Sequence, residues 1–335
     1  MTKTPSEAAP KPYQLVAFPQ ERPNLQRPIG HHKYLSDRLH GTLYLTLKVQ
    51  TSLHVSTGLV VLGSDINRKV SLIKTMVQDV DQKLSIQGSS LKGCIRSVYE
   101  AITNSTLGAV TNKYNKANKY PPERLPCGNK EKLCPASRVF GALNWQGLLD
   151  FNDATCTTMD FSTGFMPSLY APRPNNQVYL NKGKAAGRKF YYNTNKAIDK
   201  GENSGIAVQQ AGREYTFVTE LNFKNLSSEE LGTLLIALGQ DPKYPIALKV
   251  GGGKPIGMGT MTVSIDRIVQ PQDLKQRYSS YQVSASDEIT GEKLAQFKQK
   301  HIQAAHSRLI EKTQLEELAA ILRYPSDRQP PAGMY

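Results

Sequence analysis

GSSLKGCIRSVYEAI, residues 88–102, predicts an amphipathic helix with an unusual beginning. Its apolar residues recur at helical spacing and share one face: Leu91, Ile95, Val98, Tyr99 and Ile102. Glycine and two serines open the helix, where a serine oxygen can accept a bond from an amide that the first turn leaves unpaired. Lys92 and Arg96 lie one turn apart, off the apolar face and near the positive end of the helix. The stretch predicts either a place for a phosphate or another anion, or an ordinary capped helix with a basic, solvated face.

The segments on either side of this helix alternate between strand and helix. Alternating apolar and polar residues, or short apolar runs, predict four strands: residues 41–49, 215–223, 246–250 and 260–268. The glycine-punctuated residues 51–70 predict little regular structure. A second helix begins at NLSSEE (residues 225–230) and closes at Gly239, and one or two amphipathic helices lie at residues 288–323. This order predicts an α+β fold of the ferredoxin-like kind, with an antiparallel sheet and helices on one side.

The composition indicates the class of partner. Lysine and arginine total 42 against 28 aspartates and glutamates, which gives the 335-residue chain a formal charge of +14. So basic a balance favours nucleic acid over an anionic membrane surface, and the alternative is a generally basic protein without such a partner. No apolar run is long enough to span a membrane, and the Pro-rich N-terminus has no apolar signal core. We therefore expect a cytoplasmic protein that contacts no membrane.

Residues 166–213 combine basic and aromatic residues and predict a surface for a single strand of nucleic acid. The basic residues are Arg173, Lys182, Lys184, Arg188, Lys189, Lys196, Lys200 and Arg213, and the aromatic ones are Tyr170, Tyr179, Phe190, Tyr191 and Tyr192. Cations contact phosphates without regard to sequence, and aromatic rings stack on unpaired bases. The alternative, a charged disordered insertion, is disfavoured because disordered segments contain few aromatic residues.

Three blocks of sequence, in this order, resemble signatures of the RAMP superfamily of CRISPR-associated proteins: GSSLKGCIR (88–96), CPASRVFGALNWQGLLDFNDA (134–154) and GGGKPIGMG (251–259). The middle block resembles one found in backbone subunits of type III effector complexes, and GRKFYYN (187–193) is similar to a segment of some of those subunits. The resemblance implies an RRM-like palm that holds a guide CRISPR RNA along a filament of similar subunits, and a thumb that separates guide from target at intervals. The implied partners are the guide, single-stranded target RNA and other CRISPR effector subunits.

Composition and resemblance together divide the chain and assign residues to RNA. The parts are a flexible N-terminal arm (1–40), an RRM-like palm (41–165 and 214–270), an inserted basic–aromatic thumb (166–213) and a C-terminal helical extension (271–335). The residues expected to bind RNA are His54, Gly88, Ser89, Ser90, Lys92, Arg96, Lys182, Lys184, Arg188, Lys189, Tyr191, Gly251, Gly252, Gly253 and Lys254. Glycines suit this role because a backbone without Cβ atoms lets amides approach a phosphate closely.

Two kinds of RNA cleavage are consistent with the sequence. Related backbone subunits cut target RNA with an aspartate in the loop that precedes the helix at residue 88, together with Mg²⁺ or Mn²⁺. The position implied for it, residues 72–74, holds no carboxylate, so Asp65 is the remaining catalytic candidate, against its interpretation as a turn residue. The other kind is a metal-independent endoribonuclease that processes guide precursor RNA, with His54 as the base. A capping or adaptor subunit at the end of a complex is a further alternative.

Cys127 and Cys134 are the candidates for metal binding. They lie in a polar loop rich in glycine and lysine, which some relatives use for a zinc knuckle. Residues 134–137 read Cys-Pro-Ala-Ser where those relatives have a C-P-x-C element, so one ligand pair is lost. Because a structural zinc ion usually takes four Cys or His ligands, the alternative is a set of reduced, unpaired thiols.

Overall fold

The computed structural model describes residues 12–116, 118–168, 179–198, 205–271, 279 and 287–331. Its central sheet is antiparallel, and the strands follow the order β16 (Leu248–Lys249), β17 (Thr260–Val269), β2 (Leu39–Val49), β15 (Thr216–Leu226), β9 (Ala154–Cys156) and β5 (Ser85–Ile86). Two short strands join it, β18 (Glu288–Ile289) on β17 and β8 (Leu149–Phe151) on β15. On β2, Leu43, Leu45 and Leu47 are buried, as the alternation of the sequence predicts.

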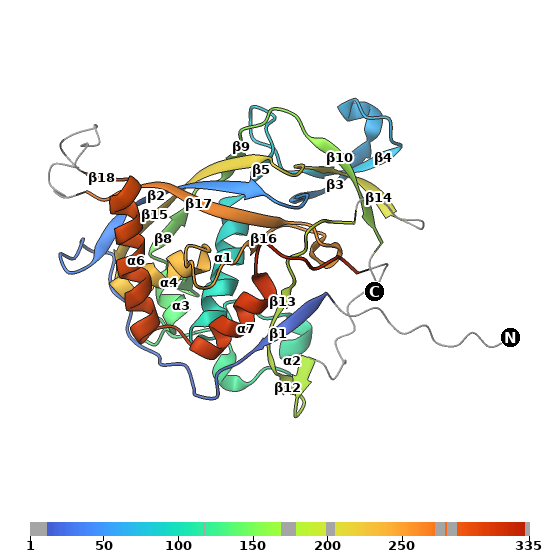
Figure 1. Cartoon of the computed structure of the whole chain (residues 1–335). Helices are drawn as coiled ribbons and strands as arrows, with labels where there is room; N and C mark the ends of the chain where they lie inside the picture. Colours follow the sequence, from blue (N-terminus) through green and yellow to red (C-terminus); the bar gives the residue numbers. More distant parts are fainter. Residues whose placement is uncertain are drawn as a thin grey trace.

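The helices cover one face of this sheet (Figure 1). They are α1 (Gly88–Ile102), α3 (Pro135–Phe140), α4 (Ser228–Ala237), α6 (Gly291–Arg308) and α7 (Lys312–Leu322), with the short α2 (Asn112–Lys116) at the periphery. α4 begins with a capping box, in which the side chains of Ser227 and Glu230 bond to each other's backbone amide. α6 packs so closely on α4 that a Cβ atom on Gly232 would lie 1.9 Å from the His301 carbonyl oxygen. The predicted α+β fold is confirmed, and buried residues of the C-terminal helices, among them Ile302 and Leu318, belong to its hydrophobic core.

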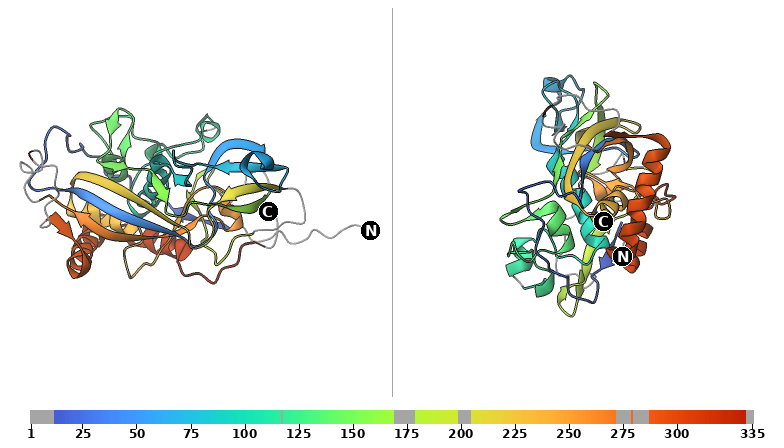
Figure 2. Two further views of the ribbon diagram at one scale, coloured as in Figure 1. Left: turned by 90° about the horizontal axis from the view of Figure 1, so that it is seen from above. Right: turned by 90° about the vertical axis from the view of Figure 1, so that its left-hand side faces the viewer.

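A second sheet lies at one end of the molecule (Figures 1 and 2). Its order is β10 (Ser162–Pro167), β14 (Gly205–Gln210), β4 (Leu72–Met76) and β3 (Ser56–Leu62), with the 3₁₀ turn η1 (Gly63–Ile66) after β3. The sequence predicts little structure where β3 forms, because β3 is exposed on both faces and its apolar residues do not alternate with polar ones. The predicted thumb (residues 166–213) is divided: β14 belongs to this sheet, whereas β13 (Gly187–Tyr191) lies elsewhere.

Of the predicted N-terminal arm (residues 1–40), residues 12–40 are described, and they contain a strand and further contacts with the rest of the protein. β1 (Tyr13–Ala17) pairs with β13 in an antiparallel ladder. Beyond it, the buried Arg124 guanidinium donates to the carbonyl oxygens of Pro19 and Glu21, at 2.5 and 2.6 Å. A Pro-rich segment has few amides with which to form a ladder, and the five N–H donors of one arginine hold its carbonyl groups instead.

Short elements complete the described chain: β6 (Gly141–Ala142) with β7 (Trp145–Gln146), β11 (Leu180–Asn181) with β12 (Lys184–Ala185), η2 (Pro122–Arg124) and η4 (Lys254–Ile256). Among the helices of the described residues, none is both long and apolar enough to cross a membrane.

Candidate functional site

The exposed face of α1 consists of small residues. Ser89, Gly93 and Ser97 are exposed at four-residue spacing, and Ser90 is half-buried beside them. A Cβ atom built on Gly93 would meet no other atom within 4 Å. Glycine inside a helix costs about 1 kcal/mol relative to alanine, and no packing contact in the described protein requires it here. This face lets an extended partner approach the helix backbone closely.

The glycine loop (residues 251–259) begins beside this face. Just before the loop, the Lys249 carbonyl oxygen accepts a hydrogen bond from the Cys94 thiol of α1, at 3.4 Å. The glycines at 251, 253, 257 and 259 have positive φ angles, which glycine adopts without strain. At Gly259, a Cβ atom would lie 1.9 Å from the Val250 carbonyl oxygen. The structure therefore brings together the two motifs that the sequence singles out, and packing fixes the backbone of the loop.

The glycine loop carries donors that the described protein does not use. The amides of Gly251, Gly253 and Lys254 donate to no atom of the residues that the structure covers. Within that same part of the chain, the half-buried Lys254 ammonium forms no ion pair. A Cβ atom at Gly252 would fit without a clash, in van der Waals contact with the His54 carbonyl oxygen at 3.6 Å. Unpaired backbone N–H groups and a cation in one short loop can bind an anion.

The sequence predicts that Gly88 helps to bind an anion at the start of α1. The structure places this glycine inside the protein instead. It is buried, and a Cβ atom on it would lie 2.1 Å from the Phe151 carbonyl oxygen. Its amide donates to the Asp153 carboxylate at 2.7 Å. The glycine therefore permits close packing against the β8–β9 connection, and Asp153 already balances the positive end of the helix.

The guanidinium groups of Arg96 and Arg188 pair with a buried carboxylate of the protein, and their role in binding RNA stays a prediction. Glu100 on α1 is 5% exposed and accepts from both: its oxygens lie 2.7 Å from Arg96 Nε and 2.5 Å from Arg188 Nη1. Burial lowers the pKa of Arg188, and Glu100 opposes that change. Lys92 is half-buried on the same flank of α1, and its ammonium donates to the Leu149 carbonyl oxygen at 3.4 Å.

The other basic residues expected to bind RNA lie on the β11–β12 hairpin and on β13, the strand that pairs with β1. Lys182 is exposed and Lys184 half-buried on the β11–β12 hairpin. The exposed Lys189 ammonium lies 4.9 and 4.8 Å from the ring centres of Tyr13 and Tyr191 and donates to the Tyr191 hydroxyl at 2.9 Å. Tyr170, Arg173 and Lys200 lie outside the described residues.

His54 supports the glycine loop from beneath. Its ring is 2% exposed, and Nδ1 donates to the Gln209 carbonyl oxygen at 2.7 Å. Nε2 is buried and has no hydrogen-bond partner among the described residues. Burial lowers the pKa of the ring, which is therefore neutral at pH 7. The His54 carbonyl oxygen accepts from the Gly252 amide at 2.8 Å, so this residue contacts the loop through its backbone.

Asp65 lies exposed in η1, at the turn between β3 and β4 of the second sheet. Residues 72–74, where the resemblance places a catalytic aspartate, form part of β4. Asp79 is occupied in a turn, because its carboxylate accepts from the amides of Asp81 and Lys83, both at 2.9 Å. Asp65 has no hydrogen-bond or ion-pair partner among the described residues, and its carboxylate is open to solvent.

Cys127 and Cys134 lie together, as the metal prediction requires, but without further ligands. The Thr106 hydroxyl is within 3.4 and 3.2 Å of their sulfur atoms. Within the described ranges, no group of three or more His, Cys, Asp or Glu residues could hold a metal ion, and all four cysteines are unpaired. Two thiols alone do not fit a structural zinc ion, which usually takes four ligands. The hydrogen bond with Cys134, and then burial, raise the pKa of Cys127 and keep it a thiol.

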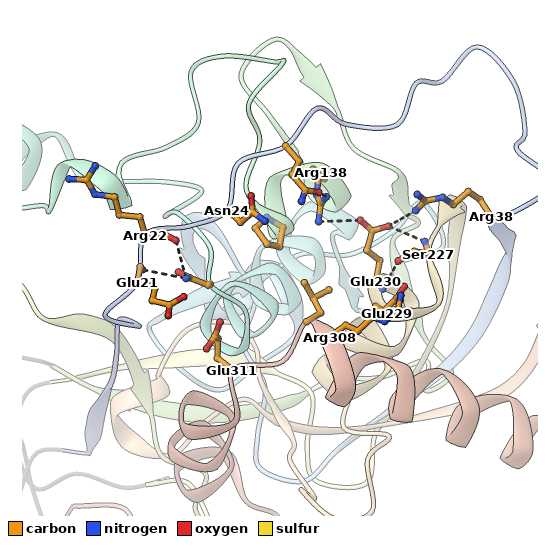
Figure 3. Close-up of a pocket in the computed structure, with 14 residues that line it drawn as sticks. Glu21, Arg22, Asn24, Arg38, Arg138, Ser227, Glu229, Glu230, Arg308 and Glu311 are labelled. Carbon is orange, nitrogen blue, oxygen red and sulfur yellow. Dashed lines mark hydrogen bonds and ion pairs between the residues drawn. The ribbon is translucent and has the colours of Figure 1, made fainter.

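A pocket of about 510 Å³ lies between the N-terminal segment and α3, α4 and α6 (Figure 3). Its charged residues are Glu21, Arg22, Arg38, Arg138, Glu229, Glu230, Arg308 and Glu311. Glu230 lies 3.7 Å from Arg38 and 3.8 Å from Arg138, and Glu229 lies 3.0 Å from Arg308. The arginines and glutamates balance, so this pocket joins structural elements and does not offer net positive charge to a polyanion.

Comparison with known proteins indicates the family of the chain. A search of curated proteins finds no match to the chain. The family model of the RAMP superfamily matches residues 46–262, which is more than half of the chain and includes both α1 and the glycine loop. The chain therefore belongs to the RAMP superfamily of CRISPR-associated proteins, a family that binds RNA.

Proposed function

We propose that the chain is an RNA-binding subunit of a type III CRISPR ribonucleoprotein, and that RNA phosphates follow the exposed face of α1 and the glycine loop. In this role it holds the guide RNA and positions complementary target RNA among other effector subunits. The observation that carries the proposal is the joint position of Gly93 and the unused amides of Gly251, Gly253 and Lys254. The face around Gly93 is open, the unused amides are donors for an anion, and the net charge of +14 favours a phosphate backbone.

Gly93→Gln tests this path. A glutamine side chain on the open face is expected to block the RNA and to lower affinity at least about tenfold, or 1.4 kcal/mol. The same change replaces a helical glycine, so the free energy of unfolding should rise by about 0.5–1 kcal/mol. Fluorescence anisotropy with a labelled single-stranded RNA and urea denaturation measure the two effects.

The matched control is Gly128→Gln, because Gly128 is also exposed with no neighbour near its Cβ position but lies in the loop after η2. It should bind RNA like the wild type. Equal affinities for both variants and the wild type would contradict the proposed path. The urea denaturation curve shows whether each variant is folded under the conditions of the binding measurement, so a loss of binding caused by unfolding can be recognised.

Cleavage of target RNA at Asp65 is a second part of the proposal, supported by the exposed carboxylate without a protein partner. Mg²⁺ and Mn²⁺ prefer oxygen ligands and often bind through one or two carboxylates and substrate phosphates. In the assembled complex with either ion, Asp65→Asn should remove the cut made at this subunit from an otherwise regular ladder of target fragments. Asp81→Asn, which alters another exposed aspartate, should leave the ladder intact. An unchanged ladder with Asp65→Asn would make the subunit a binding platform only.

The alternative of a metal-independent endoribonuclease finds no support in the geometry. Its candidate base, His54, is 2% exposed and donates through Nδ1 to a backbone carbonyl group. A general base must come within hydrogen-bond reach of the 2′-hydroxyl that it deprotonates. Cutting of guide precursor RNA without metal, abolished by His54→Ala in a folded protein, would restore this alternative.

A further inference from the structure

A second pocket, of about 540 Å³, opens on the flank of α1 opposite the glycine loop. Cys94 and Lys92 occupy the two flanks of α1, because residues two apart in a helix point to nearly opposite sides. Cys94 contacts the start of the glycine loop, and Lys92 lines this pocket. The exposed face around Gly93 lies between them. An extended strand that crosses this face from the loop therefore arrives at the pocket.

Two lysines give the pocket its charge. Lys92 donates only to a carbonyl oxygen, and Lys224 on β15 is half-buried. Neither forms an ion pair in the portion of the chain that the structure describes, and the pocket holds one carboxylate, that of Asp150. Burial, and then the nearby Arg96, lower the pKa of Lys92, and the Asp150 carboxylate opposes them in part. An anion in the pocket would counter both influences.

Two aromatic rings form another part of the pocket wall. Tyr34 is 36% exposed, and the His40 ring packs edge-on against it, with 4.9 Å between ring centres and 79° between planes. His40 Nδ1 accepts from the Asn225 amide at 3.3 Å, which places the ring proton on Nε2. Burial lowers the pKa of His40, so that the ring stays neutral.

The wall is held in place by a buried residue. Asn225 is 0% exposed, and its side chain accepts from the Leu35 amide at 3.0 Å and donates to the carbonyl oxygens of Gly30 and Lys33, at 3.2 and 2.9 Å. These three bonds fix the segment that carries Tyr34. The ring is therefore positioned before any ligand arrives, which lowers the entropic cost of binding.

We infer that this pocket, here named the Tyr34 pocket, holds one nucleotide of the bound RNA, with the base stacked on Tyr34 and a phosphate between Lys92 and Lys224. A stacking ring beside two lysines that form no ion pair among the described residues matches the two halves of a nucleotide, and the volume is in the range of ligand pockets. The inference rests on the proposed function, since it extends the path of the RNA beyond α1.

Tyr34→Ala and Lys224→Met test the inference with a short single-stranded RNA. Tyr34→Ala should weaken binding about 5- to 150-fold, the range for loss of one stacked base, and Tyr34→Phe should stay close to the wild type. Lys224→Met should weaken binding and reduce the slope of log affinity against log salt by about one unit. An RNA that carries a 4-thiouridine should cross-link to Tyr34, and mass spectrometry locates the adduct.

Gly93→Gln separates failure of the pocket from failure of the proposed function. If Gly93→Gln weakens binding while Tyr34→Ala and Lys224→Met bind like the wild type, the RNA follows α1 and the Tyr34 pocket does not take a nucleotide. If none of the three variants weakens binding, the proposed path fails as well. If Tyr34→Ala and Tyr34→Phe weaken binding equally, the hydroxyl and not the ring is used, which overturns stacking.

Discussion

Glu100→Gln is expected to lower the free energy of unfolding by about 3–5 kcal/mol, as removal of one partner from a buried ion pair does. Glu100 is 5% exposed and lies between Arg96 and Arg188. Glutamine keeps the size of the side chain but removes the negative charge, so two largely buried guanidinium groups lose their counter-charge. Urea denaturation of the two proteins measures the difference.

Arg188→Met decides between the structural and the RNA-binding interpretation of this arginine. It leaves Glu100 paired with Arg96, so its cost should be smaller than that of Glu100→Gln, and the RNA affinity of the folded protein should not change. Arg213→Met is the control, because the Arg213 side chain is 67% exposed and its removal should have little effect on stability. Unchanged stability together with weaker RNA binding in Arg188→Met would show that the guanidinium turns toward RNA.

The sequence predicts those helices and strands that bury one face and expose the other, because their apolar residues then recur at a regular spacing. Alternation locates β2 and β15, and helical periodicity locates α1, because each element packs one side against the same core. The glycine loop is recognisable for a different reason, since only glycine adopts its positive φ angles without strain. β3 is missed because it is exposed on both faces and therefore carries no alternation.

Which acidic residue pairs with which basic residue depends on tertiary contacts, and the spacing of residues in the sequence does not contain this information. Lys92, Arg96 and Arg188 look equally basic in the sequence, yet two of them pair with Glu100 and one faces a pocket. Asp153, which receives the Gly88 amide, lies 65 residues away in the chain. The exposed face of α1 has a readable signal in the four-residue spacing of Ser89, Gly93 and Ser97. From the sequence, the cations beside that face are assigned to RNA, although it is the small residues that form the open surface.

A second large effect is expected from Lys249, a cation buried beneath the glycine loop. It is 5% exposed, and its ammonium donates to the Gly257 carbonyl oxygen and the Thr260 hydroxyl, both at 3.0 Å. In the described residues no carboxylate pairs with it. Burial, and then repulsion from Lys254, lower the pKa of Lys249 from 10.5 to about 7. A buried amine with neutral acceptors alone retains much of the cost of losing water.

This cost makes stability depend on pH in a defined direction. Between about pH 7 and pH 10 the unfolded chain binds a proton at this lysine that the folded chain has released, so the free energy of unfolding rises with pH. The rise contributed by Lys249 reaches at most about 1.4 kcal/mol per pH unit, and below pH 7 the destabilisation is fully present. Lys249→Met, similar in size and uncharged, should therefore exceed the wild type in stability at pH 6, with a difference that shrinks toward pH 10.

Urea denaturation at several pH values isolates this contribution, because the other titratable groups are common to both proteins and largely cancel in the difference. Lys254→Met keeps the buried amine but removes its charged neighbour, so the rise should begin at a higher pH than in the wild type. Parallel pH curves for the wild type and Lys249→Met would contradict the prediction, since they require an amine that binds its proton equally in both states. Such an amine would need a counter-charge or water beneath the loop, and the loop would then be more open than its packing against Val250 indicates.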